Sequence, residues 1–486
     1  MLEKIKLIPL STVNAVPGDQ LITRRSALHW SAATLIFAAI NSISKASASV
    51  KPNDTDLKRI ARDMTEKSMQ PSSALATKQQ RLTERRALDI FSSATVKSAM
   101  AKTLASFIAD PNAKLADQKQ LMQQSVNEHY FHSSLMAASE TPRSPAFIWC
   151  IALPHQWMGL DVPGSRFGHD NTDNAYRIAA IEPTLQYKIT GHFAGPRPCD
   201  FSICVLPRQV GDDIAADVKA IIAIDEIDVD AEGYFSITVD ASATAGRRNH
   251  LCIADGKVLF ARDTLANWEV ERASELNIQR TDGPTVDDFD ATQAVTRAAA
   301  LGATIANFFL KNVQHGMFER APINTIPVPV PSGPRGGLTT QLGTVGFYTL
   351  NNDEALVISA DRLGARYLGI QIIDMWMVSY EYSQHTSSLN HEQAVANADG
   401  RYRWVVSAQD PGVLNWLDSG GNAHGNVLMR WQKLPAGIDI NNCVSAQIVK
   451  LSALREVLPP DTQYLDAQAR EEQRARRLQS YQWRVV

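Results

Sequence analysis

The residues with the clearest capacity for chemistry lie between positions 374 and 431. His385 and His424 stand there in loop-like surroundings, and the carboxylates of Asp410 and Asp418 lie in the same stretch. An imidazole that is oriented by a carboxylate is a common means of general acid or base catalysis near pH 7. We therefore predict that His385, His424, Asp410 and Asp418 are catalytic residues.

The same stretch offers groups that could hold a ligand. Arg430 could pair with an anionic group, and Trp376 and Trp416 could stack against a sugar or an aromatic ring. We predict Trp376, Asn390, Trp416 and Arg430 as substrate-binding residues. The alternative for Asn390 is a hydrogen bond to its own backbone. Trp416 stands beside turn residues, where packing alone explains a large aromatic side chain less well.

These groups predict a non-redox enzyme of the lyase, hydrolase or isomerase type, acting on a small ring-bearing or carbohydrate-like substrate. The alternatives are a non-catalytic ligand-binding module and a structural module of the cell envelope. The enzyme and the binding module differ in whether His385 or His424 shares a concavity with a carboxylate, since binding needs no poised base. We expect a small-molecule ligand, and the sequence assigns neither a cofactor nor an oligomeric state.

Several other function classes are excluded. The sequence lacks the nucleophile elbow G-x-S-x-G of α/β-hydrolases and the zinc-protease motif H-E-x-x-H. It also lacks G-x-x-x-x-G-K-[ST] and G-x-G-x-x-G, the glycine motifs of nucleotide-dependent enzymes. The net charge of -3 offers no electrostatic footprint for nucleic acid. His129 and His132 lie on one face of an expected helix beside Glu128, but two imidazoles without a further carboxylate are a weak signal, and we predict no metal site.

The first 49 residues have the features of an export signal. Arg24 and Arg25 form a twin-arginine pair, a mildly apolar run covers residues 32–43, and Ala46-Ser47-Ala48 fits a cleavage site. The apolar run is too short for a transmembrane span. We therefore expect a periplasmic or secreted protein, and the alternative is a cytoplasmic protein with an amphipathic start. In an exported protein Cys199 and Cys204 could form a disulfide, and the alternative is buried free thiols.

Periodicity predicts the fold class. Apolar residues recur at helical spacing from Leu82 to Ile108 and again over residues 287–310. Short strands with turn signals follow residue 145, and residues 227–239 alternate around a glycine turn as a hairpin does. We predict a mainly β protein with a helical N-terminal region and two antiparallel β-sandwiches. The predicted parts are a signal segment (1–49), a helical region (50–140), a β-sandwich (145–275), a helix with a proline-rich linker (280–340), a second β-domain (341–456) and a C-terminal helix (461–486).

The second β-domain resembles the family known as domain of unknown function 1214. The resemblance covers roughly residues 340–455, and it implies a jelly-roll-like sandwich without implying an activity. Members of the family often carry a smaller sandwich upstream, which residues 145–270 could represent. The motifs that carry the resemblance are Asp374-x-Trp376, Ser387-Ser388-Leu389-Asn390, Asp399-Gly400-x-Tyr402-Arg403, Asp410-Pro411-Gly412, Asn415-Trp416-Leu417-Asp418 and Arg430-Trp431.

Overall fold

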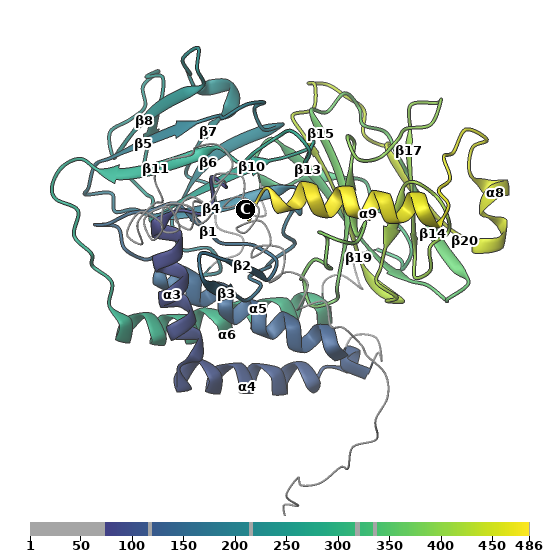
Figure 1. Ribbon diagram of the computed structural model, residues 1–486, viewed down its shortest axis with the longest axis horizontal. Helices are drawn as coiled ribbons and strands as arrows, with labels where there is room; N and C mark the ends of the chain where they lie inside the picture. Colours follow the sequence, from purple (N-terminus) through teal and green to yellow (C-terminus); the bar gives the residue numbers. More distant parts are fainter. Residues whose placement is uncertain (1–72, 115–118, 213–216, 316–320, 334–337, 486) are drawn as a thin grey trace, which may run out of the picture. The chain divides into compact units, whose positions relative to one another are not determined.

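The computed structural model describes residues 73–114, 119–212, 217–315, 321–333 and 338–485, which all belong to one compact unit of the chain. Helices come first, two β-sandwiches follow with a long helix between them, and a last helix follows the second sandwich (Figure 1). The predicted fold class is confirmed. The predicted signal segment lies outside the described residues. No helix of the described ranges is long and apolar enough to cross a membrane.

The helices pack against one another, with α5 in contact with α3, α4 and α6 (Figure 1). Their bounds are α3 (Lys78–Ser92), α4 (Ala94–Ile108), α5 (Lys119–Ala138) and α6 (Ala291–His315). The Thr77 hydroxyl accepts a hydrogen bond from the N–H of Gln80 at 3.0 Å and caps α3, and Ser93 caps α4 in the same way. Because α5 has neighbours on several sides, nearly every side chain from Val126 to Ala138 is buried.

The first sandwich pairs a five-stranded sheet with a four-stranded sheet. Neighbouring strands are antiparallel except β8 and β9, which run parallel. A small hairpin, β2 (His155–Trp157) and β3 (Leu160–Val162), is inserted after the first strand. The larger sheet has the order β1 (Ile148–Trp149), β4 (Asn174–Ala180), β10 (Val258–Thr264), β6 (Asp200–Leu206) and β7 (Ala220–Ala223); the smaller has β11 (Glu275–Arg280), β5 (Tyr187–His192), β8 (Tyr234–Asp240) and β9 (His250–Cys252).

The second sandwich again pairs five strands with four. One neighbouring pair, β17 and β18, is parallel and the others are antiparallel. The chain then forms the short helix α8 (Leu454–Val457) and the C-terminal helix α9 (Ala467–Gln482). The larger sheet has the order β12 (Val330–Pro331), β13 (Gln341–Thr349), β19 (His424–Gln432), β15 (Tyr367–Ile373) and β16 (Ser388–Asn390); the smaller has β18 (Trp416–Asp418), β17 (Tyr402–Ser407), β14 (Glu354–Ala360) and β20 (Val444–Lys450).

The two sandwiches repeat one topology. If the inserted hairpin is set aside, the nine strands of each sandwich occupy the same places in the same chain order, and even the parallel pair is repeated. The central strands β10 and β19 correspond in register. Thr264 and Gln432 pair with the first residues of β6 and β15, and Arg262 and Arg430 stand two positions earlier. Thr264 and Gln432 contact each other, Oγ1 to Oε1, at 3.3 Å.

Both faces of each large sheet are buried, which explains why β4, β6, β10 and β15 carry no exposed residue. One face of β10, with Leu259 and Ala261, packs into the core of its own sandwich. The other face, with Phe260, joins an apolar cluster that also includes helix residues and Leu428 of β19. The helices therefore share one core with the outer faces of both large sheets.

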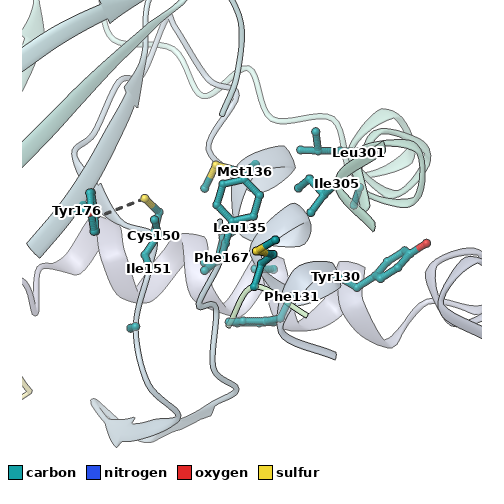
Figure 2. Close-up of a cluster of buried hydrophobic side chains, with 14 of the residues drawn as sticks. Tyr130, Phe131, Leu135, Met136, Cys150, Ile151, Phe167, Tyr176, Leu301 and Ile305 are labelled. Carbon is teal, nitrogen blue, oxygen red and sulfur yellow. Dashed lines mark hydrogen bonds between the residues drawn. The ribbon is translucent and has the colours of Figure 1, made fainter. Parts of the chain in front are cut away.

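Figure 2 shows part of this shared core. Leu135 of α5 and Phe167 lie between Leu301 and Ile305 of α6 on one side and Cys150 on the other. The Cys150 thiol donates to the carbonyl of Tyr176 at 3.5 Å. Cysteine acts here as a small buried apolar residue. All five cysteines are free thiols, so Cys199 and Cys204 form no disulfide.

Candidate functional site

A cavity of about 180 Å³ gathers ionisable side chains from distant parts of the chain. Arg166 comes from the loop before β4, Asp374, Glu381 and His385 come from the connection between β15 and β16, and Asp418 ends β18. The rest of the lining includes Tyr380 and the N-terminal part of α5. The cavity is the place in the described chain where a predicted imidazole and a predicted carboxylate meet.

His385 and Asp418 form the core of this site. The Nδ1 atom of His385 lies 2.7 Å from Oδ2 of Asp418, and Nη2 of Arg474 on α9 lies 3.2 Å from the same oxygen. The N–H of Gly420 donates to the other oxygen at 2.8 Å. Asp418 is buried, while the side chain of His385 is 43% exposed. An imidazole with one buried partner and one free side can exchange a proton with a bound molecule.

The two groups shift each other's proton affinity. The hydrogen bond to Asp418 raises the pKa of His385, although partial burial opposes the shift. Burial alone would raise the pKa of Asp418, but the bonds from His385 and Gly420 and the charge of Arg474 hold it below the ordinary value. The pair is therefore an imidazolium and a carboxylate over a wider pH range than free side chains would be.

Asp374 is a buried carboxyl on the same cavity. Its Oδ1 accepts from the N–H groups of Trp376 (2.8 Å) and Val378 (2.9 Å), and its Oδ2 accepts from the Ser125 hydroxyl (2.9 Å). These bonds hold a tight turn in which Met377 has a φ of 70°. Burial raises the pKa of Asp374 to about 7 despite the bonds. Near neutral pH this carboxyl can therefore either give or take a proton.

Arg166 lines the cavity and forms a buried ion pair with Glu128 of α5. Its Nε donates to Glu128 at 2.8 Å, a second guanidinium nitrogen completes the bidentate pair, and its own backbone N–H also donates to Glu128 at 3.0 Å. The third nitrogen donates to the carbonyl of Ser379 at 2.5 Å. A Cβ on Gly164 would lie 2.5 Å from the Glu128 carboxyl carbon, so only glycine permits this approach.

Two of the four predicted catalytic residues do not line the cavity. Asp410 forms an ion pair with Arg470 of α9, whose Nε lies 2.9 Å from the carboxylate. His424 begins β19 and is half-buried, and its carbonyl accepts from the Tyr380 hydroxyl at 3.0 Å. The structure therefore brings together His385 and Asp418 and leaves the other two outside.

The four predicted substrate-binding residues also lie outside the cavity lining. Trp376 is fully buried against Phe107, with ring centroids 5.1 Å apart. Trp416 is buried, and its indole N–H donates to a backbone carbonyl at 3.1 Å. Neither ring offers a free face for a ligand, because packing against the protein occupies both. A role for them in binding stays a prediction without a geometric basis in this conformation.

Asn390 and Arg430 join the two sandwiches instead. The amide nitrogen of Asn390 donates to the carbonyl of Ala266 at 2.8 Å. The guanidinium of Arg430 donates to Gln371 at 3.0 Å and to the backbone carbonyl of His169 in the first sandwich. Buried donors of this kind need such partners, because an unpaired one costs about 1–3 kcal/mol.

Sequence reasoning missed Arg166 and Arg474 as parts of the site. Arg166 lies in the polar loop 164–171, and polar loops of this kind can border a binding site, but they are more typical of solvated turns. Arg474 sits in a helix whose charges can pair locally at i,i+4 spacing, and that pattern hides its contact with Asp418. Asp374 stood out only through the family resemblance.

His129 and His132 are core residues. His132 stacks on Phe167 with ring centroids 4.4 Å apart, and His129 packs against Phe309 at 5.0 Å. Burial lowers the pKa of His129 to about 3 and that of His132 to about 4. Among the described residues no group of three or more His, Cys, Asp or Glu side chains is arranged to hold a metal ion.

No family model matches the chain. No curated protein matches it either. The structure is similar to that of an uncharacterised protein from Burkholderia cenocepacia, with a TM-score of 0.60, 21% sequence identity, and coverage of 76% of this chain and 100% of that one. The match to a protein from Vibrio parahaemolyticus covers 58% of this chain and 90% of that one, with 9% sequence identity and a TM-score of 0.35. The first likeness supports the fold alone, and the resemblance to domain of unknown function 1214 stays a prediction.

Proposed function

We propose that this protein is an enzyme that uses the His385 cavity for non-redox acid and base chemistry on a small polar molecule. The observation that carries the proposal is the shared cavity itself: the pair of His385 and Asp418 and the carboxyl of Asp374 line one space of about 180 Å³. A general acid and a general base on one substrate need this arrangement. The reaction class is that of a lyase, a hydrolase or an isomerase.

The roles follow from the protonation states. His385 holds its proton to a higher pH than a free imidazole because Asp418 accepts its hydrogen bond, so His385 serves as the general acid. Asp374, with a pKa of about 7, serves as the base on the same cavity. Neither role requires a group that the described chain does not supply.

The size and lining of the cavity set the substrate class. A volume of 180 Å³ is below the roughly 300–1,000 Å³ of pockets for drug-sized ligands. Tyr380 is the aromatic residue of the lining, and no tryptophan lines the cavity. We therefore propose a small hydroxylated or carbonyl-bearing molecule in place of the stacked ring that the sequence predicts.

A ligand-binding module without turnover is the second candidate, and one observation favours it. The oxygens of Glu381 accept from the N–H groups of Ser383 (3.0 Å) and Gln384 (2.9 Å), and Asp374 is held by three similar bonds. Carboxylates with so many internal bonds can shape a pocket without reacting. The twin-arginine pair supports the further proposal that either activity is exercised outside the cytoplasm.

The test is a turnover screen on the full chain. The purified protein is incubated with hydroxy acids, small esters, lactones and amides, and the mixtures are followed by proton NMR. Activity that falls at least a hundredfold in His385→Gln and in Asp374→Asn, with Asp228→Asn as a surface control, supports the enzyme. His424→Gln should keep activity, since His424 lies outside the cavity lining. Saturable binding without turnover would favour the binding module, and activity indifferent to both site variants would refute the proposed site.

A further inference from the structure

A second and larger cavity, of about 560 Å³, lies on the first sandwich and is separate from the His385 cavity. Its floor is the outer face of the smaller sheet, and its walls include residues 271–273, the chain from Ser73 to Thr77 and the end of α9 with Trp483. The two cavities share no lining residue. The volume falls within the range usual for small-molecule sites.

The floor is a polar and aromatic platform built by cross-strand pairs. His192 of β5 pairs with Glu275 of β11 on one side and with Tyr234 of β8 on the other. Its ring stacks on Tyr234 with centroids 4.0 Å apart, and its Nδ1 lies 3.4 Å from Glu275. The next pair along β5 and β11, Thr190 and Asn277, is exposed on the same face.

The second sandwich shows that this face can be closed. There the outer face of the equivalent sheet is apolar, with Val357 and Val405, and Leu454 and Leu458 of the following segment cover it. In the first sandwich the corresponding strands present hydroxyl, amide, imidazole and carboxylate groups, and a cavity lies over them. The same sheet face is therefore covered by apolar side chains in the second sandwich and lined by a cavity in the first.

The rim of the cavity carries exposed aromatic rings. Tyr234 is 54% exposed and Trp483 is 48% exposed, although side chains this large are usually more buried. The guanidinium of Arg272 covers part of Trp483, with its carbon 4.5 Å from the ring centroid. Rings with one face free can stack on the apolar face of a sugar.

The charges of the lining select a neutral ligand. Glu271 and Glu275 oppose Arg272 and Arg484, so neither sign dominates. Side chains such as Asn277 and Thr190 both donate and accept hydrogen bonds, as hydroxyl groups of a ligand require. We propose that this cavity binds a neutral oligosaccharide, which rests on the platform of Thr190, His192 and Asn277 and stacks on Tyr234 and Trp483.

The experiment uses the full chain with maltotriose, cellotriose and N-acetylated chitotriose as neutral probes and trigalacturonate as a charged one. Binding is measured by saturation-transfer NMR and by titration of tryptophan emission. Trp483→Ala removes the stacking ring, and Asn277→Leu, an exposed floor position, removes the amide with little risk to folding. The matched control is Ile438→Ala, which changes an exposed apolar side chain outside the cavity.

Saturable binding of at least one neutral probe, weakened about tenfold or more by each site variant and unchanged by the control, is the expected result. Three results would overturn the proposal: no saturable binding of a neutral probe at millimolar concentration, binding that both site variants leave intact, or tighter binding of trigalacturonate than of every neutral probe. Because His385 lies outside this cavity, His385→Gln should leave the binding constant unchanged.

Discussion

The buried ion pair of Glu128 and Arg166 is the contact whose removal should weaken the structure most. Its side chains are only 4% and 1% exposed, and Arg166 also bonds the carbonyl of Ser379. The pair thus joins α5, the loop before β4 and the segment that lines the His385 cavity. Glu128→Leu would leave a buried guanidinium without the carboxylate that it bonds, and Arg166→Met would leave a buried carboxylate without its bonded cation.

The expected cost of either single change is large. Removing one partner of a buried pair costs about 3–5 kcal/mol, because the remaining charge is uncompensated. The net stability of an ordinary domain is only about 5–15 kcal/mol. Each single variant should therefore lower the midpoint of urea unfolding strongly. The double variant should lose much less than the sum of the two, because an apolar pair of similar size leaves no orphaned charge.

The assay is a double-mutant cycle on the full chain, with unfolding followed by far-UV circular dichroism and by tryptophan emission. Agreement of the two signals is needed before free energies are compared. The exposed pair of Arg248 and Asp228 provides the control, and Asp228→Asn should leave the midpoint unchanged. A Glu128→Leu variant as stable as this control would refute the reasoning. A double variant as unstable as the summed singles would show that lost packing, and not orphaned charge, is responsible.

Three further predictions concern protonation. Burial lowers the pKa of His129 to about 3, so the unfolded chain binds more protons between pH 6.5 and about 3, and stability falls as pH drops through this window. His129→Leu should flatten that fall in melting temperature. Burial raises the pKa of Asp374 to about 7, so between about pH 4 and 7 the folded chain binds more protons than the unfolded chain, and stability falls as pH rises through this window. Asp374→Asn should remove this loss of stability, as measured by melting temperature. The charge of Arg474 lowers the pKa of His385, so Arg474→Gln should raise it in an NMR titration, and Arg476→Gln should not.

Local patterns predicted some of the helices and strands. The hairpin predicted over residues 227–239 is only half right: its second strand is β8 (Tyr234–Asp240), after a turn in which Gly233 adopts a φ of 95°, but residues 227–230 form no strand and β8 pairs with β5 and β9. The stripe over residues 287–310 corresponds to α6, which runs on to His315. These signals depend on neighbours within one or two turns of the chain, so a single sequence displays them.

Alternation of apolar and polar residues does not mark a strand that is buried on both faces. β15 (Tyr367–Ile373) reads as a continuous apolar run broken by Gly369 and Gln371, because one face meets its own sandwich and the other meets the shared core. The sequence also did not show which residues pack α9 against the rest of the protein. The buried residues of that helix are Tyr481 and two arginines, Arg470 and Arg477. Buried arginines look like surface charge until their partners are known.

The candidate site could be only half predicted for a related reason. His385 and Asp418 lie 33 positions apart, and nothing local favours Asp418 over Asp410 as the partner of the imidazole. The choice is made by the parallel pairing of β17 and β18, which sets Asp418 beside Ser407 at the end of both strands. Arg166 is more than 200 positions from the backbone carbonyl that it bonds. Contacts at such separations are decided by the whole fold.

The repeated topology separates the frame of the second sandwich from most of the proposed site. Arg262 and Arg430 occupy equivalent positions, yet Arg262 donates to the thiol of Cys204 at 3.3 Å, whereas Arg430 bridges to the other sandwich. The shared strands thus supply a frame whose equivalent residues have diverged into packing roles. Asp374, Glu381 and His385 all belong to the connection between β15 and β16, outside those strands, and only Asp418, the last residue of β18, belongs to a repeated strand. Because loops on a rigid frame can change without unfolding it, substitutions at Glu381 and His385 should alter chemistry at little cost in stability, whereas changes in β15 should do the reverse.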